Sequence, residues 1–198
     1  MLNHDFGAGF ADPVRDAQGS FRAILDALAN PGRPQRLVLT DNVSSHLKGE
    51  LVSALLTLTD HDTPIWLSPA IDTEAVKKFV TFHTGAPLVT ETQKASFAFV
   101  ALGDALPDLS RFNLGTQEYP DRSTTIIVEL PALTGGPTRT LRGPGIRETQ
   151  EISPQGLPDD FVRQWRENRA LFPRGVDLLL VAHGEVLGLP RTSRIVEA

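Results

Sequence analysis

The sequence contains no cysteine. Disulfide bonds, thiolate catalysis and cysteine-ligated zinc or iron–sulfur centres are therefore excluded. No apolar run approaches the roughly 20 residues that a membrane-spanning helix needs. The first ten residues contain Asp5 and neither a basic cluster nor a long apolar run, which is unlike a secretory signal. We therefore expect a cytoplasmic protein with no membrane segment.

Lysine is scarce as well. Of the 19 basic residues, 15 are arginine and four are lysine. A pyridoxal phosphate (PLP) site needs a lysine that forms a Schiff base, usually beside a loop near strand ends. Lys48 falls in an expected helix, Lys77 and Lys78 form a helical pair, and Lys94 falls in a polar loop before a strand. We therefore expect this chain to bind no PLP.

Arginine, by contrast, is abundant, and its planar guanidinium group binds phosphate and carboxylate groups through paired hydrogen bonds. Codon bias in a GC-rich genome produces the same excess, so position must decide which arginines matter. The formal net charge of −5 argues against nonspecific nucleic-acid binding and against a polybasic membrane surface. The 198 residues are 40% apolar and 22% charged, as is usual for a soluble globular protein.

Helical and strand patterns are mixed along the chain. Asp12 and Pro13 are typical of a helix start, and apolar residues recur at helical spacing until Asn30-Pro31-Gly32. Further helices are expected over residues 45–59, 72–84 and 158–171. Strands are expected over residues 36–40, 64–67, 96–102, 124–130, 138–141, 148–152, 176–182 and 186–189. Residues 106–121 are expected to be irregular, with a helical turn near Leu109. No repeat or linker divides the chain, so residues 1–198 are predicted to form one α/β domain, a sandwich with a mixed sheet.

Two carboxylates flank a histidine where the second helix gives way to a strand. Asp60, His61 and Asp62 are therefore candidate catalytic residues, because a histidine beside a carboxylate is a suitable acid–base pair near neutral pH. The alternative is a polar turn that caps the helix. A metal site is not expected, since adjacent side chains on extended backbone point to opposite faces.

A glycine turn forms a second candidate site. Gly143 and Gly145 enclose Pro144, and Arg139, Arg142 and Arg147 flank the turn. Backbone N–H groups of glycine-rich turns cradle anions, and arginines beside them suit a triphosphate. Arg142, Gly143 and Gly145 are thus expected to bind an anion, although no P-loop sequence is present. The alternative is a tight turn with solvated arginines.

The segment after the last expected strand extends this candidate site. It contains Arg191, Thr192 and Arg194, whose guanidinium and hydroxyl groups suit phosphate or the carboxylates of a partner. Arg191 and Thr192 are expected to belong to the anion site. An exposed tail is the alternative.

Short segments in a fixed order along the chain carry a family resemblance. They are Asp12-Pro13-Val14, Phe21-Arg22, Pro31-Gly32, Thr57–Leu67, Phe82-His83-Thr84, Gly143 with Gly145, Phe172-Pro173 with Gly175 and Asp177, and Pro190-Arg191-Thr192. Together they resemble the PhnH family, the H subunit of bacterial carbon–phosphorus lyase in phosphonate metabolism. Ser193 departs from the family pattern, where a threonine is common.

The resemblance implies a fold like that of PLP-dependent transferases without the cofactor, and a homodimer. It also implies partners, namely the G, I and J subunits of the same complex. That assembly uses MgATP as a substrate and replaces its adenine with a phosphonate, giving a ribose 1-phosphonate 5-triphosphate. Two alternatives stay open: a scaffold subunit that performs no chemistry, and an independent dimeric enzyme for a small anionic metabolite.

Overall fold

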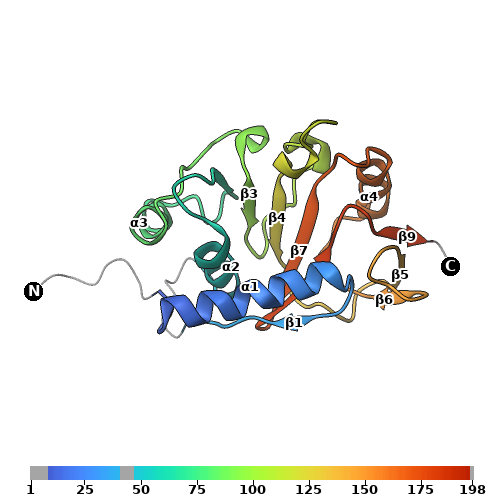
Figure 1. Cartoon of the computed structure of the whole chain (residues 1–198), viewed down its shortest axis with the longest axis horizontal. Helices are drawn as coiled ribbons and strands as arrows, with labels where there is room; N and C mark the ends of the chain where they lie inside the picture. Colours follow the sequence, from blue (N-terminus) through green and yellow to red (C-terminus); the bar gives the residue numbers. More distant parts are fainter. Residues whose placement is uncertain (1–8, 41–46, 197–198) are drawn as a thin grey trace, which may run out of the picture.

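The computed structural model describes residues 9–40 and 47–196. Its helices are α1 (Pro13–Ala29), α2 (Gly49–Leu58), α3 (Glu74–His83) and α4 (Phe161–Ala170), with short 3₁₀ turns η1 (Thr92–Lys94), η2 (Leu109–Arg111) and η3 (Pro120–Arg122). Its strands are β1 (Gln35–Arg36), β2 (Ile65–Leu67), β3 (Phe97–Val100), β4 (Thr125–Glu129), β5 (Arg139–Arg142), β6 (Gln150–Ile152), β7 (Asp177–Ala182), β8 (Glu185–Leu189) and β9 (Arg194–Val196). Figure 1 shows their arrangement.

The main sheet has six strands in the order β1-β8-β7-β4-β3-β2. Strands β2, β3, β4 and β7 run parallel, whereas β8 and β1 are antiparallel to their neighbours. A separate sheet of three antiparallel strands has the order β6-β5-β9. The predicted α/β class with a mixed sheet is confirmed, and the likeness to PLP-dependent transferases stays a prediction.

Side chains alternate across the main sheet and feed two hydrophobic cores. On β7, Leu179 and Val181 join a core with α1, α2 and α3. Leu178 and Leu180 join a second core with α4, η2 and the small sheet. The main sheet is therefore the middle of three layers. Its second face is covered mostly by short elements and loops rather than by long helices.

Helix α1 lies across the sheet because small residues line its buried side. Ser20, Ala23 and Ala27 are buried there, and α1 packs against β8 at Gly188. A Cβ atom at Gly188 would stand 2.4 Å from the backbone oxygen of Ala27. The hydroxyl of Ser20 lies 3.0 Å from that of Ser53 and links α1 to α2.

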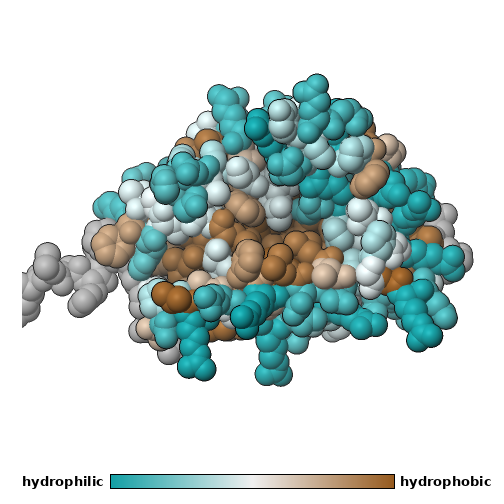
Figure 2. Space-filling view, in the orientation of Figure 1, coloured by the Kyte–Doolittle hydropathy of each residue, from teal (hydrophilic) through white to brown (hydrophobic). Residues whose placement is uncertain are grey.

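The helical spacing of apolar residues predicted α1. It did not predict that several apolar side chains of α1 are exposed to solvent. Val14, Phe21 and Leu25 are 71%, 45% and 49% exposed. At 100° per residue they share one side of the helix, next to the buried side. Figure 2 shows apolar surface gathered in a hollow along α1, above a row of hydrophilic side chains.

Several expected elements differ at their ends. The strand expected over residues 36–40 is only the pair Gln35–Arg36. Of the helix expected over 45–59, residues 45 and 46 lie outside the described residues, and α2 begins at Gly49. The sequence did not predict β9, which pairs with β5. Through residue 196, the C-terminal segment is therefore part of the fold and not an exposed tail.

We predict that Gly188→Ala destabilises the protein by about 1–3 kcal/mol, because the added methyl group collides with backbone and not with a side chain that can move. Urea unfolding measures the change. Gly49→Ala is the matched control: a Cβ there meets only the Leu39 side chain at 3.5 Å, so stability should be unchanged or slightly raised. Equal midpoints for Gly188→Ala and the unmodified chain would contradict the close approach of α1.

Candidate functional site

The Asp60-His61-Asp62 segment forms a tight polar turn between α2 and β2. The backbone oxygen of Asp60 accepts hydrogen bonds from the N–H and hydroxyl of Thr63 at 3.1 and 2.9 Å. The carboxylate of Asp60 accepts one from the N–H of Asp62 at 3.0 Å. These contacts are typical of an Asx turn, in which a carboxylate replaces a backbone acceptor.

The side chains of His61 and Asp62 lie close together at the surface of this turn. Nε2 of His61 lies 3.3 Å from Oδ2 of Asp62, and the two side chains are 79% and 82% exposed. Their exposure favours the structural alternative over an acid–base pair in a cavity. Across residues 9–40 and 47–196, no group of three or more histidine, aspartate or glutamate side chains is placed to hold a metal ion. In the same ranges, no helix is both long and apolar enough to cross a membrane.

Arg191 is enclosed by protein partners. Its Nε donates to both carboxylate oxygens of Asp177 at 3.1 and 3.2 Å, and its backbone N–H donates to the same carboxylate at 2.6 Å. Its terminal nitrogens donate to the backbone oxygens of Pro120 and Pro173 and to the hydroxyl of Ser123. The side chains of Arg191 and Asp177 are only 14% and 19% exposed. In this conformation the guanidinium group makes its hydrogen bonds within the protein and stabilises the fold.

The elements α4, β5 and β9 lie at the end of the molecule opposite α3 (Figure 1), and three other arginines line a common cavity there. Arg142, Arg169 and Arg194 line a cavity of about 260 Å³ with Gly143, Pro144, Phe172 and Thr192. We call this cavity the arginine pocket. It brings together three of the predicted anion-site residues, namely Arg142, Gly143 and Thr192.

The charges of the arginine pocket are unbalanced. Arg142 and Arg194 lie directly opposite each other on antiparallel β5 and β9, a placement in which like charges repel. The guanidinium of Arg169 lies 5.4 Å from the centre of the Phe172 ring, and its buried Nε has no hydrogen-bond partner. Among the described residues, no carboxylate forms a salt bridge with these three arginines. A bound anion would relieve the repulsion and supply the missing acceptor.

The two glycines of the turn have different roles. Gly143 lines the arginine pocket. Gly145 packs against the end of α1, with φ of 80°, and a Cβ there would stand 2.1 Å from the backbone oxygen of Ala29. Gly145 therefore sets the course of the turn.

Sequence reasoning missed Arg169 and Phe172. Both lie at the end of α4, far from the glycine turn in the chain. They reach the pocket because α4 packs against β9, where the indole N–H of Trp165 donates to the backbone oxygen of Ser193 at 3.1 Å. No local sequence pattern predicts that α4 packs against β9.

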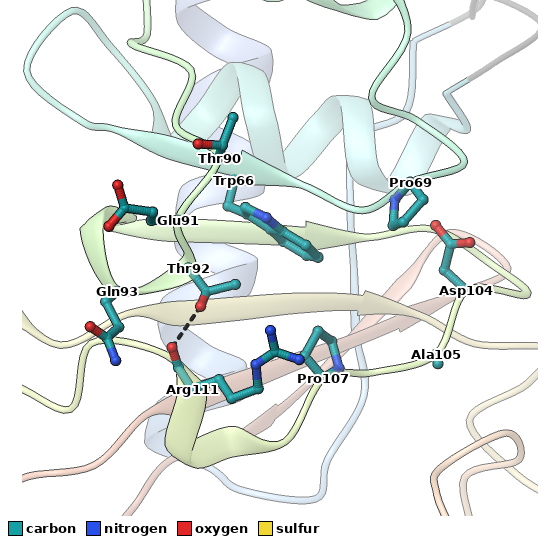
Figure 3. Close-up of a pocket in the computed structure, with 10 residues that line it drawn as sticks. All are labelled: Trp66, Pro69, Thr90, Glu91, Thr92, Gln93, Asp104, Ala105, Pro107 and Arg111. Carbon is teal, nitrogen blue, oxygen red and sulfur yellow. Dashed lines mark hydrogen bonds between the residues drawn. The ribbon is translucent and has the colours of Figure 1, made fainter.

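A larger cavity lies at the opposite edge of the main sheet, beside β2. Its volume is about 690 Å³, and Figure 3 shows its lining: Trp66, Pro69, Thr90, Glu91, Thr92, Gln93, Asp104, Ala105, Pro107 and Arg111. We call it the tryptophan cavity. It contains one aromatic ring, one guanidinium group and two carboxylates. The sequence analysis singled out none of these groups as a site.

The fold is that of an α/β protein with a mixed sheet, and three guanidinium groups gather in its arginine pocket. The family model described as "Bacterial phosphonate metabolism protein (PhnH)" matches residues 8–196. The chain belongs to this family, which confirms the resemblance seen in the sequence.

Two relatives support the assignment. The chain is 47% identical over 190 residues to a Rhizobium meliloti (strain 1021) protein named "Alpha-D-ribose 1-methylphosphonate 5-triphosphate synthase subunit PhnH", covering 96% of this chain and 95% of the relative. It is 29% identical over 180 residues to a Stutzerimonas stutzeri protein named "Putative C-P lyase subunit protein HtxG", covering 90% and 85%. Both relatives are named as subunits, and the function of this chain lies in phosphonate metabolism.

We predict that Arg191→Met lowers the free energy of unfolding by about 3 kcal/mol, the lower end of the range for a broken buried ion pair, because both side chains keep some exposure. Thermal or urea unfolding measures the loss. The matched control is Arg163→Met, because Arg163 pairs with Asp160 and Glu167 but is 55% exposed. Its loss should leave stability nearly unchanged, because exposed ion pairs contribute little. Equal losses in the two variants would show that Arg191 is not a structural anchor.

Proposed function

We propose that this chain is the H-type subunit of an alpha-D-ribose 1-methylphosphonate 5-triphosphate synthase. The observation that carries the proposal is the 47% identity to the Rhizobium meliloti subunit along nearly the whole length of both chains. In the proposed reaction, a phosphonate oxygen forms a bond to C1′ of the ribose of MgATP. The bond from C1′ to adenine breaks, and adenine leaves with a proton. The proposed partners are the G, I and J subunits.

The contribution proposed for this chain is anion binding in the arginine pocket. ATP and alkylphosphonates both carry the oxyanions that guanidinium groups recognise. The opposed pair Arg142 and Arg194 and the unpartnered Nε of Arg169 support this role. The pocket volume of about 260 Å³ suits a phosphonate or part of a triphosphate and not a whole nucleotide.

A scaffold subunit without chemistry of its own is the second candidate. It is favoured by the exposed turn that holds His61 and Asp62, since these side chains lie in water and not in a cavity. The arginine pocket would then receive an acidic segment of a partner subunit. The two candidates differ in what the pocket binds, so one set of variants separates them.

The test is reconstitution. We expect adenine release from MgATP and methylphosphonate when this chain is mixed with the G, I and J subunits, and loss of that release when this chain is omitted. Chromatographic detection of adenine follows the reaction. Full activity without this chain would reject the proposed function, and adenine release by this chain alone would support an independent enzyme instead.

The double variant Arg142→Gln and Arg194→Gln tests the role of the pocket in the same mixture. Loss of each charged hydrogen bond costs about 1.5–3 kcal/mol, so even one lost contact should weaken the binding of ATP or methylphosphonate roughly ten- to a hundredfold, as measured by calorimetry. Arg147→Gln is the matched control, since Arg147 is exposed in the same turn and does not line the pocket.

The two readouts of the double variant separate the candidates. Weaker anion binding with intact co-purification supports a substrate role. Lost co-purification with intact anion binding supports docking of an acidic partner. If both match the control, the arginines are solvated surface and the pocket has no role.

A homodimer is proposed as well, as the family resemblance implies. The surface that suits a second copy is the exposed apolar side of α1, including Phe21 and Leu25, because large apolar patches are rare on monomers. Arg15 and Asp26 lie near opposite ends of α1 on one side of it. An antiparallel second copy of α1 would therefore bring each arginine to the aspartate of its partner.

Light scattering at micromolar concentration tests the homodimer. We expect twice the single-chain mass of 21.5 kDa for the unmodified protein and the single-chain mass for Leu25→Glu, because the new carboxylate would be buried between the copies. Ala75→Glu on α3 places the same charge at an exposed position elsewhere and should stay dimeric. A mass near 21.5 kDa for the unmodified chain would reject the proposal.

A further inference from the structure

The short elements on the second face of the main sheet do not cover the sheet as far as its edge at β2, and the tryptophan cavity lies in the uncovered part. Strand β2 is the edge strand, and its Ile65 and Leu67 point into the first core. Trp66 points to the other face of the sheet, and the residue paired with it on β3 is the small residue Ala98. Beyond its edge-on contact with Phe112, at 6.1 Å between ring centres, the indole stays partly uncovered.

Groups from four separate segments point into this cavity around the indole (Figure 3). Trp66 projects from β2, and the head of Arg111 approaches from the opposite side. Asp104 and Pro69 stand at one end of the ring, and the segment from Thr90 to Gln93 stands at the other. The result is an aromatic platform surrounded by hydrogen-bonding groups.

Hydrogen bonds hold these groups in place. Oδ2 of Asp104 accepts from the N–H of Ala70 at 2.8 Å. The hydroxyl of Thr92 donates to the backbone oxygen of Arg111 at 2.6 Å, which joins the two sides of the cavity. The turn η2 that carries Arg111 is capped by Asp108. Hydrogen bonds from Ser110 to that carboxylate also hold the pKa of Asp108 below its ordinary value.

The charges of the lining favour an uncharged ligand with N–H donors. Glu91 is already paired with Lys94 at 2.6 Å, so Asp104 and Arg111 are the ionic groups left to face a ligand. A triphosphate would meet a carboxylate as well as a guanidinium group. A planar nitrogen heterocycle would stack on the indole, donate to Asp104 and accept from Arg111.

We propose that the tryptophan cavity binds a purine base, stacked on Trp66 and held at its edge by Asp104 and Arg111. The volume of about 690 Å³ falls within the usual range for small-molecule sites and leaves room for a ribose. The choice of a purine rests on the proposed function, in which adenine is the leaving group, and binding by the isolated chain tests it separately from the reconstitution.

Calorimetry of the unmodified chain with adenine and adenosine is the primary test. We expect saturable binding of both, and since neither carries a phosphate group, neither should bind through the arginine pocket. Intrinsic fluorescence gives a second readout. Trp165 is buried at 1% exposure, so quenching by a purine reports mainly on Trp66. Absence of saturable binding of either purine up to millimolar concentration would overturn the proposal.

Variants locate the site. Trp66→Leu keeps an apolar side chain but removes the ring, and Arg111→Gln changes an exposed position that should not affect folding. Each should weaken adenine binding at least tenfold. Tyr119→Leu is the matched control, since Tyr119 is a 49% exposed aromatic residue outside the cavity. Unchanged adenine affinity in Arg111→Gln and in folded Trp66→Leu would place the purine elsewhere and reject the site. Equal binding of indole and adenine would reject recognition of a purine.

Discussion

The ion pair between Arg191 and Asp177 is the interaction on which the C-terminal half of the structure depends. It joins the start of β7, the connection from β8 to β9, the turn η3 and the loop after α4, all through one guanidinium group. Thr192 and Arg194 follow directly and line the arginine pocket. The positions of Thr192 and Arg194 in that pocket therefore depend on the ion pair between Arg191 and Asp177, which does not itself line the pocket.

The two faces of the main sheet are covered by different kinds of element. On one face, α1, α2 and α3 cover the strands, and the close approach of α1 to Gly188 leaves little space between the layers. On the other face, a short helix, the 3₁₀ turn η2 and a small sheet cover the strands incompletely. Both the arginine pocket and the tryptophan cavity lie in the layer that is made of short elements. Loops and element ends are where proteins commonly place binding groups.

The sequence predicted features whose cause is local. Asp12 caps α1 by accepting from the N–H of Arg15, and the apolar runs around Phe99 and Ile127 form β3 and β4 as expected. Features that depend on packing could not be predicted this way. A pair of opposed arginines needs the register of β5 against β9, and Arg169 needs the position of α4. The Asp-His-Asp pattern fits a turn and a site equally well until its exposure is known.

The opposed arginines have a consequence for how the pocket responds to its surroundings. Arg142 and Arg194 carry like charges on paired strands, and both are exposed to solvent. Dissolved ions therefore screen the repulsion between them, over about 8 Å at physiological ionic strength. Any anion that settles between β5 and β9 also stabilises the small sheet that holds it. The stability of the small sheet should therefore depend on the ionic strength of its surroundings.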